Sequence, residues 1–93
     1  MNDSTIFRPR PTIRFRVVGD EGVIVRQDSA EVVAVNEVGA SVLALLDSKR
    51  TIGDVLEQLF QEYDVDPESL RTDVMRFIDE LSSAGLVEEM ESR

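Results

Sequence analysis

Hydrophobic and polar positions alternate in the first third of the chain. The stretch TIRFRVV, residues 12–18, places an apolar side chain at every second position with arginines between them, which is the period of a half-buried β-strand. Residues 23–27 and 31–35 are rich in β-branched side chains and predict two further strands. Because only short polar breaks separate the three segments, they favour an antiparallel meander.

The hydrophobic period changes at Asn36. Beyond this residue, apolar side chains recur three or four positions apart, which predicts an amphipathic helix that ends near Asp47. Asparagine is a favourable N-cap, because its side chain accepts a hydrogen bond from an unpaired amide of the first helical turn. Gly39 and Ala40 are small, so we expect another backbone to pack closely against this part of the helix.

Two more helices are predicted in the second half of the chain. Thr51, with an aspartate three residues later, resembles a capping box, and apolar residues at helical spacing follow it as far as Tyr63. Asp66 is the expected N-cap of a third helix, with Pro67 at its first position. Gly85 is the expected C-terminal cap, and the apolar pair after it predicts a short strand.

The order of elements is therefore a three-stranded antiparallel sheet followed by three helices, which places the chain in the α+β class. We expect residues 1–11, with their two prolines, to form a flexible or extended N-terminal segment. Residues 12–89 are predicted to form one folded domain, and residues 90–93 a C-terminal tail.

Composition narrows the functional classes. The chain has 93 residues, suited to one small domain, and 42% of them are hydrophobic. It contains no cysteine and no histidine, so thiolate metal sites, disulfides and the commonest general base are missing. It has neither an apolar run of transmembrane length nor the apolar core of a secretory signal. We therefore expect a cytoplasmic, non-catalytic protein that holds no cofactor or metal.

The net charge of −9 is unevenly distributed. Residues 1–16 carry four arginines and one aspartate, whereas residues 51–93 carry three basic and twelve acidic groups. The acidic half should repel nucleic acid and phospholipid, although it also has the composition of an ordinary solvated helical surface. Arg14 and Arg16 lie on the solvent face of the first predicted strand, where they either protect a sheet edge or meet an acidic partner enzyme or peptide.

The segment VAVNEVGASVLALLDSKRTIGDVLEQLFQEYDVDPESLRTDVMRFIDELSSAGLVE resembles the PqqD family. That family has a strand ending in Asn-Glu-x-Gly/Ala, a helix ending in Leu-Leu-Asp, a basic residue and Thr before the second helix, and Tyr-x-Val-x-x-Glu before a third helix that ends at Gly-Leu. The matching residues are Asn36, Glu37, Gly39, Ala40, Leu45, Leu46, Asp47, Arg50, Thr51, Tyr63, Val65, Glu68, Leu81, Gly85 and Leu86. The resemblance covers about residues 12–89. Ser48 departs from it, since the family usually has glycine there, and we interpret this as a looser turn.

The resemblance implies a winged-helix-like fold and a non-catalytic recognition element for ribosomally made precursor peptides. A member of this family binds the leader of a precursor peptide and presents it to a modifying enzyme, often a radical S-adenosylmethionine enzyme. The founding member acts in pyrroloquinoline quinone biosynthesis. In this family the leader adds as a strand to the edge of the third strand and lies against the third helix, which agrees with the free sheet edge predicted from the residues.

The resemblance places the peptide site on two elements of this chain. The edge strand is formed by Glu31, Val32, Val33, Ala34 and Val35, and the helical wall by Arg71, Val74, Met75 and Ile78. Met75 is adaptable enough to line a permissive groove, and Arg71 is a candidate to pair with a leader carboxylate. The structural alternatives are that Val74 and Ile78 belong to the core and that Arg71 is a solvated surface charge.

Other functions remain open at this stage. The same edge would also suit a subunit that binds a partner protein instead of a peptide, and an unpaired edge is compatible with a monomer or a weak dimer. A winged-helix DNA regulator is disfavoured, because the third predicted helix carries four acidic residues and two arginines. Asp64 and Asp66 have side chains that can bind a hard cation, but their positions fit a turn and a helix cap.

Overall fold

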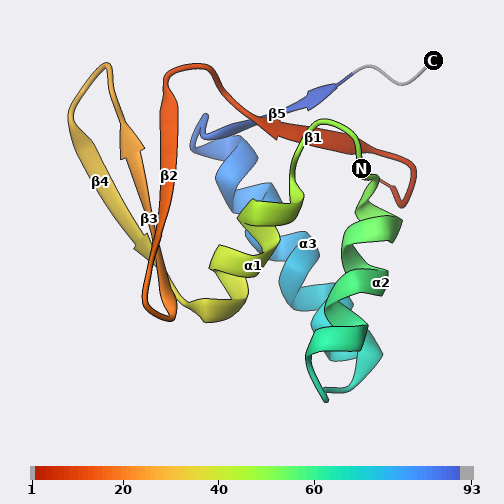
Figure 1. Cartoon of the computed structure of the whole chain (residues 1–93). Coiled ribbons are helices and arrows are strands. Elements are labelled where there is room, and N and C mark those ends of the chain that lie inside the picture. The colour runs from red at the N-terminus through yellow and green to blue at the C-terminus, as the bar shows by residue number, and fades with distance from the viewer. Residues whose placement is uncertain (1, 91–93) are drawn as a thin grey trace.

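The computed structural model describes residues 2–90, which form five strands and three helices. In chain order these are β1 (Ile6–Pro9), β2 (Ile13–Val18), β3 (Glu21–Arg26), β4 (Glu31–Val35), α1 (Glu37–Leu45), α2 (Ile52–Glu62), α3 (Pro67–Ser83) and β5 (Val87–Met90). Strands β2, β3 and β4 lie together at one side of the molecule, and the three helices lie at the other (Figure 1). None of the helices in the described range is long and apolar enough to cross a membrane.

The three-stranded sheet has the predicted antiparallel order β2-β3-β4. The β2–β3 hairpin turns at Gly19 and Asp20, and its register pairs Val18 with Glu21 and Ile13 with Arg26. The α+β class, the three-stranded antiparallel sheet and the three helices predicted from the hydrophobic pattern are therefore confirmed.

A second sheet joins the two ends of the described chain and was not predicted. Strand β1 pairs antiparallel with β5, from Ile6 opposite Met90 to Pro9 opposite Val87. Part of residues 1–11, expected to be flexible or extended, is thus extended and paired as a strand, and Met90, expected in the tail, belongs to β5. Residues 91–93 lie outside the described range. The physical reason is that Phe7, only 3% exposed, packs into the core, which its proline-rich surroundings do not reveal.

Local side-chain chemistry sets the helix ends as predicted. The Asn36 side chain accepts a hydrogen bond from Gly39 N at 2.8 Å, and Thr51 forms a capping box at the start of α2. Asp66 caps α3 and Pro67 occupies its first position. Gly85, with φ of 75°, follows the last residues of α3 in a left-handed conformation that glycine adopts readily.

The turn between α1 and α2 is more tightly bonded than expected. Asp47 Oδ1 accepts hydrogen bonds from the backbone N–H groups of Lys49 and Arg50, both at 3.0 Å. These backbone bonds, together with the Arg50 guanidinium, hold the pKa of Asp47 below its usual value. Ser48 has φ of 68°, the left-handed region that favours glycine, so the departure from the family pattern falls on a conformationally demanding position.

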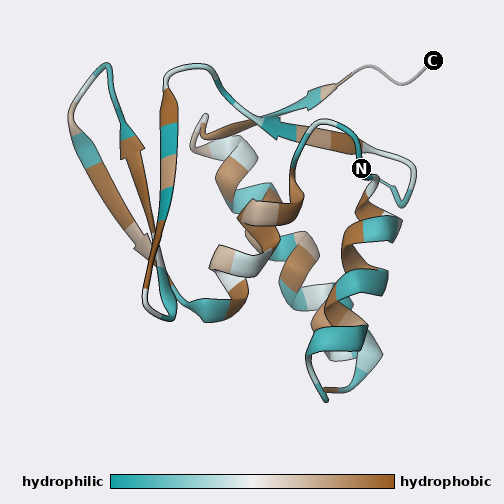
Figure 2. Cartoon of the chain, in the orientation of Figure 1, coloured by the Kyte–Doolittle hydropathy of each residue, from teal (hydrophilic) through white to brown (hydrophobic). Residues whose placement is uncertain are grey.

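One hydrophobic core connects every element except β4 through fully buried side chains. Its least exposed members are Ile24, Val42, Leu46, Ile52, Val55, Leu59, Val74, Ile78 and Val87. The sheet packs on α1 through its inner face, where Ile13 and Ile24 are buried and Phe15, Val33 and Val35 are partly buried. Figure 2 shows apolar and polar residues alternating along the ribbons of the helices. This packing leaves β4 as an outer strand beside the helical layer.

Candidate functional site

Strand β4 is an edge of the three-stranded sheet, and within the described residues only β3 pairs with it. Gln27 N donates a hydrogen bond to Thr12 O. In an antiparallel pair every second residue is hydrogen-bonded, so Val25, Val23 and Glu21 of β3 also bond to β2. The residues between them, Arg26, Ile24 and Gly22, turn to the other side and bond to Glu31, Val33 and Val35 of β4. Consequently the backbone N–H and C=O groups of Val32 and Ala34 point away from the sheet and are free to pair with another strand.

The side chains of β4 divide between two faces of the sheet. Val33 and Val35 are half-buried and pack against the core, whereas Val32 is 62% exposed on the opposite face. Glu31, at the start of the strand, pairs with Arg26 of β3, with 3.2 Å between Oε1 and Nε. Arg26 also donates to the carbonyl of Ala84 at the end of α3, so one side chain fastens the hairpin to the helix. The edge strand is thereby held in a defined position.

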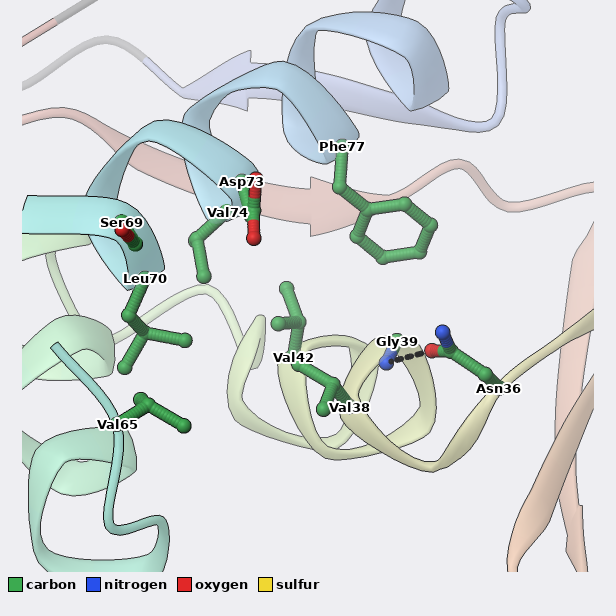
Figure 3. A pocket seen from close by; sticks show the side chains of 10 residues that line it. All are labelled: Asn36, Val38, Gly39, Val42, Val65, Ser69, Leu70, Asp73, Val74 and Phe77. Carbon is green, nitrogen blue, oxygen red and sulfur yellow. Dashed lines mark hydrogen bonds between the residues drawn. The ribbon is translucent and has the colours of Figure 1, made fainter.

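A pocket of about 410 Å³ lies next to the end of β4, between the first turns of α1 and the first half of α3 (Figure 3). Its lining is mainly apolar and consists of Asn36, Val38, Gly39, Val42, Val65, Ser69, Leu70, Asp73, Val74 and Phe77. In Figure 3 the side chains of α3 and those of α1 point toward one another across the pocket. An apolar pocket beside a free strand edge can receive a side chain from a chain segment paired with that edge.

Phe77 connects the pocket to the edge strand. A Cβ atom placed on Gly39 would lie 3.1 Å from Cζ of Phe77 and 3.1 Å from Cβ of Val35. The absence of a side chain at Gly39 therefore allows α3, α1 and the end of β4 to meet at one point. The close backbone approach predicted for Gly39 and Ala40 is found at Ala40, where a Cβ on Gly22 of β3 would lie 3.0 Å from Cβ of Ala40. At Gly39 the close neighbours are side chains and not a backbone.

Two polar groups on α3 border the apolar lining. Ser69 and Asp73 are exposed and lie on the pocket wall, whereas the Asn36 side chain is engaged in capping α1. The pocket thus presents an apolar interior with an acidic group at its margin. This arrangement favours an apolar side chain that has a neutral or basic neighbour.

The loop between α2 and α3 forms one side of the pocket. The hydroxyl groups of Tyr63 and Ser41 are 2.9 Å apart and hydrogen-bonded, which attaches the start of the loop to α1. Val65, two residues later, is 49% exposed and belongs to the lining. The hydroxyl pair therefore helps to keep an exposed apolar side chain at the mouth of the pocket.

The structure brings together only some of the residues predicted for the helical wall. Val74 lines the pocket although only 2% of its surface is exposed, and Ile78 is completely buried in the core. Met75 is half-buried against the core and does not line the pocket. One helical residue advances the side-chain direction by about 100°, so Met75 lies to one side of the inward-pointing Val74. Arg71, two turns before the buried Ile78, is exposed near the start of α3.

Arg71 faces the N-terminal segment and not β4. Its guanidinium donates two hydrogen bonds to the carboxylate of Asp3, with 3.1 Å between Nη1 and Oδ2 in one of them. This side-chain bond lowers the pKa of Asp3 and raises that of Arg71. The carbonyl of Asp3 also accepts from Gly53 N, so residues at the N-terminus join the start of α2 to α3. Arg71 therefore has a structural partner within the chain.

Several pocket residues were not singled out in the sequence, although their spacing was informative. Leu70, Asp73, Val74 and Phe77 recur at intervals of three and four, which places them on one side of α3. Nothing in this spacing itself distinguishes the half-buried margin that lines a pocket from the fully buried centre.

The cation alternative at Asp64 and Asp66 receives no support. Asp66 Oδ2 accepts from Ser69 N at 3.0 Å as the cap of α3. In residues 2–90, no three or more histidine, cysteine, aspartate or glutamate side chains are grouped closely enough to hold a metal ion. The acidic residues around this turn thus act in helix capping and as surface charges.

Comparison with known proteins relates the chain to one family and one fold. The family model described as coenzyme PQQ synthesis protein D (PqqD) matches residues 21–87. A PqqA binding protein of Bradyrhizobium diazoefficiens is 34% identical over 58 residues, which are 62% of this chain and 56% of that protein. The match thus spans little more than half the length of that relative.

Two solved structures share the fold. The structure of TbiB1 in complex with the TbiA(beta) leader peptide is similar with a TM-score of 0.80 and 19% identity, covering 91% of this chain and 99% of that chain. A lasso peptide synthetase B1 complexed with the leader peptide is similar with a TM-score of 0.77 and 24% identity, covering 88% and 96%. With the family model spanning β3 to the start of β5, the chain belongs to the PqqD family.

Proposed function

We propose that this protein binds the leader segment of a ribosomally made precursor peptide by strand addition to β4. The observation that carries the proposal is the free edge of β4, where Val32 and Ala34 direct their backbone groups outward beside an apolar pocket. Main-chain hydrogen bonds along such an edge bind an extended peptide with little dependence on its sequence. Pockets for alternate side chains then decide which peptide is accepted.

The geometry defines how the added strand would lie. Alternate side chains of the peptide would share the inner face with Val33 and Val35, and those near the end of β4 would point toward Phe77 and the pocket. On α3, the contacting margin would consist of Ser69, Asp73, Val74 and Phe77. The proposed site thus contains residues 31–35 and Val74, as the sequence predicted. Ser69, Asp73 and Phe77 take the place of Arg71, Met75 and Ile78 in the helical wall.

The comparisons support a peptide ligand. A curated relative is named for binding PqqA, and two proteins with this fold were solved with leader peptides. We infer that this chain acts by binding and not by catalysis, and that it presents its peptide to a modifying enzyme. A radical S-adenosylmethionine enzyme in pyrroloquinoline quinone biosynthesis, or in a related peptide pathway, is the partner that the family membership favours.

The second candidate is a subunit whose free β4 edge binds a partner protein without any peptide ligand. It uses the same edge and predicts the same backbone bonds. The winged-helix DNA regulator is less well supported, because α3 carries four acidic residues and two arginines, the opposite of the balance needed next to phosphates. The pocket beside β4 favours a ligand with a large apolar side chain over either alternative.

The test is a titration of the isotope-labelled protein with synthetic leader segments of short peptides encoded beside its gene, followed by NMR. We expect shifts at residues 31–35, at Val38 and Gly39, and along residues 69–77. Ala34→Pro removes an outward N–H from the free edge and should weaken binding roughly three- to tenfold, the worth of one hydrogen bond. Val17→Pro is the matched control, since Val17 is an exposed residue at the opposite edge of the sheet.

Two results would contradict the proposal. Equal weakening by both proline variants would show that binding does not depend on the β4 edge. An absence of shifts with every neighbouring peptide, at concentrations far above micromolar, would favour the partner-protein candidate.

A further inference from the structure

The outward face of the three-stranded sheet carries an aliphatic patch bordered by arginines. Paired residues of an antiparallel sheet place their side chains on the same face, so the register defines rows across the strands. One row contains Arg14, Val25 and Val32, and the next contains Arg16, Val23 and Ala34. We call these six residues the outer patch.

Four of the six residues of the outer patch are exposed, and Val23 and Val25 on the central strand β3 are half-buried. The opposite face holds the buried Ile13 and Ile24 and packs on α1, so the outer patch points away from the helices. Val32 is 62% exposed, and Val18 at the end of β2 is 64% exposed on the same face. In residues 2–90 no helix or strand covers this face, because the helices lie on the other side of the sheet (Figure 1). The ribbons of β3 and β4 have apolar stretches in Figure 2, and the register assigns their residues to the two faces.

A row of adjacent aliphatic side chains on an uncovered sheet differs from the alternation that a solvent-facing surface usually has. Solvated antiparallel sheets carry mainly polar residues on their outer face, whereas the outer patch has four aliphatic residues on the neighbouring strands β3 and β4. Contiguous exposed apolar residues with a polar border are typical of protein interaction sites.

The border of the patch is positively charged in an acidic protein. Arg14 and Arg16 are exposed on β2, and neither forms an ion pair with another described side chain. The chain as a whole has a net charge of −9, and its acidic residues are concentrated in the helical half. The patch is therefore a part of the described sheet surface that would attract a partner with acidic groups.

We propose that the outer patch docks the enzyme that modifies the bound peptide, through an apolar surface of that enzyme bordered by carboxylates. This inference rests on the proposed function. The patch lies on the same sheet as the free edge of β4. Val32 and Ala34 contribute their side chains to the patch and their backbone groups to the free edge. An enzyme on the outer face would thus lie directly beside a peptide strand added to the edge.

A second copy of this chain fits the patch less well. An isologous contact would bring another pair of Arg14 and Arg16 into the interface, and Glu21 is the acidic residue that the same face supplies to balance them. A partner of opposite border charge removes this mismatch. Self-association through the patch is therefore an outcome to be tested and not the occupant we infer.

The experiment uses the full chain, a synthetic leader segment of the neighbouring precursor peptide, and the purified modifying enzyme encoded beside the gene. Two double variants alter the patch without touching the peptide edge or the pocket, Arg14→Glu with Arg16→Glu and Val23→Thr with Val25→Thr. Threonine keeps the β-branched shape that strands favour. Arg10→Glu with Lys49→Glu is the charge-matched control, because both residues are exposed and lie outside the patch.

We expect each patch variant to weaken enzyme binding at least tenfold while leaving the affinity for the peptide within twofold of the original. The loss caused by the arginine variant should shrink at high salt, because charge attraction is screened. Enzyme binding that is unchanged in both variants, equally weakened in the control, or absent for the original protein would overturn the proposal. So would sedimentation showing a dimer that the valine variant abolishes.

The two proposals fail separately in this design. Loss of peptide binding alone would contradict strand addition to β4 while the outer patch still binds the enzyme. If all variants bind the peptide normally and the patch variants bind the enzyme as tightly as the original protein, only the proposed role of the outer patch is contradicted.

Discussion

Phe77 of α3 rests against the bare backbone of Gly39 in the first turn of α1, so closely that a Cβ on Gly39 would lie 3.1 Å from the ring Cζ. The same Cβ would lie 3.1 Å from Cβ of Val35, the last residue of β4. Interiors packed to this density respond to a single added methyl group. The contact therefore determines how closely α3 and the end of β4 approach α1 beside the pocket.

Replacing Gly39 by alanine should displace the Phe77 ring and narrow the pocket. We expect the affinity for the leader peptide to fall several-fold. Stability should change by less than about 2 kcal/mol, because the helix propensity that alanine adds, about 1 kcal/mol, offsets an overpacking cost of about 1–3 kcal/mol. Peptide titration and urea unfolding measure the two effects. Gly53→Ala is the control, since its Cβ would meet Asp3 O at 3.3 Å, away from the pocket. Equal losses of affinity would contradict the prediction.

The neighbours Phe77 and Ile78 should separate binding from stability. Ile78 has no exposed surface, so Ile78→Ala should lower the free energy of unfolding by about 2–5 kcal/mol. Phe77 is half-buried and lines the pocket, so Phe77→Ala should lower the peptide affinity at least tenfold with a smaller loss of stability. Denaturant unfolding and peptide titration of both variants test this. The reverse assignment of the two effects would place the site on the other side of α3.

The ion pair of Asp3 and Arg71 should make a pH-dependent contribution to stability. The hydrogen bonds from Arg71 hold the pKa of Asp3 below its usual 3.8 in the folded protein. The pair therefore stabilises the fold above this usual value, and the contribution is lost as the pH falls through the lowered pKa. Asp3→Asn should unfold at a lower temperature than the original protein at about pH 7, and the difference should vanish near about pH 2 or in high salt.

A variant of the same charge controls for the loss of a carboxylate. Asp79→Asn removes an exposed aspartate that makes no ion pair with the described side chains. It should show no comparable shift of the melting temperature.

Arg71→Ala tests whether Arg71 belongs to the peptide site, as the sequence predicted, although its guanidinium is bonded to Asp3. An unchanged peptide affinity would remove Arg71 from the peptide site, and a large fall in affinity would return it there.

Ser48→Gly should stabilise the protein without affecting the ligand site. Ser48 has φ of 68°, a conformation that costs a residue with a Cβ about 1–2 kcal/mol and that glycine adopts without this cost. Glycine also makes the unfolded chain more flexible, which offsets the gain in stability by about 0.5–1 kcal/mol. The net gain is up to about 1 kcal/mol, a rise of about 4–8 °C in Tm at most. Ser48→Ala keeps the Cβ and should give no rise. A higher Tm for alanine as well would contradict the conformational explanation.

Most secondary structure followed from the sequence because its causes are local. Strand β4 was predicted with its observed bounds, since a run of β-branched residues ends at the cap of the next helix. Asn36, Thr51 and Asp66 each cap the helix that their side chains predicted. Caps and periodicity depend on neighbours within one or two turns, so they can be recognised without knowing what packs above them.

The pairing of β1 with β5 could not be found in this way. Strand β1 has four residues and too short a pattern to identify. A short strand was predicted after Gly85, but nothing local indicates its partner, because the pairing joins residues as far apart as Ile6 and Met90. Only the burial of Phe7 in the common core and the cross-strand pair of Arg8 and Glu88 make the second sheet favourable.

By itself, the sequence determined the three-stranded sheet with its free strand edge and the three helices that follow it, because hydrophobic period and capping chemistry act locally. The tertiary structure decided which side of α3 faces that edge. Ile78 and Phe77 are adjacent and both apolar, yet one is in the core and the other is on the pocket wall. Their directions differ by about 100°, and only the positions of α1 and β4 determine which direction leads into the core and which into the pocket.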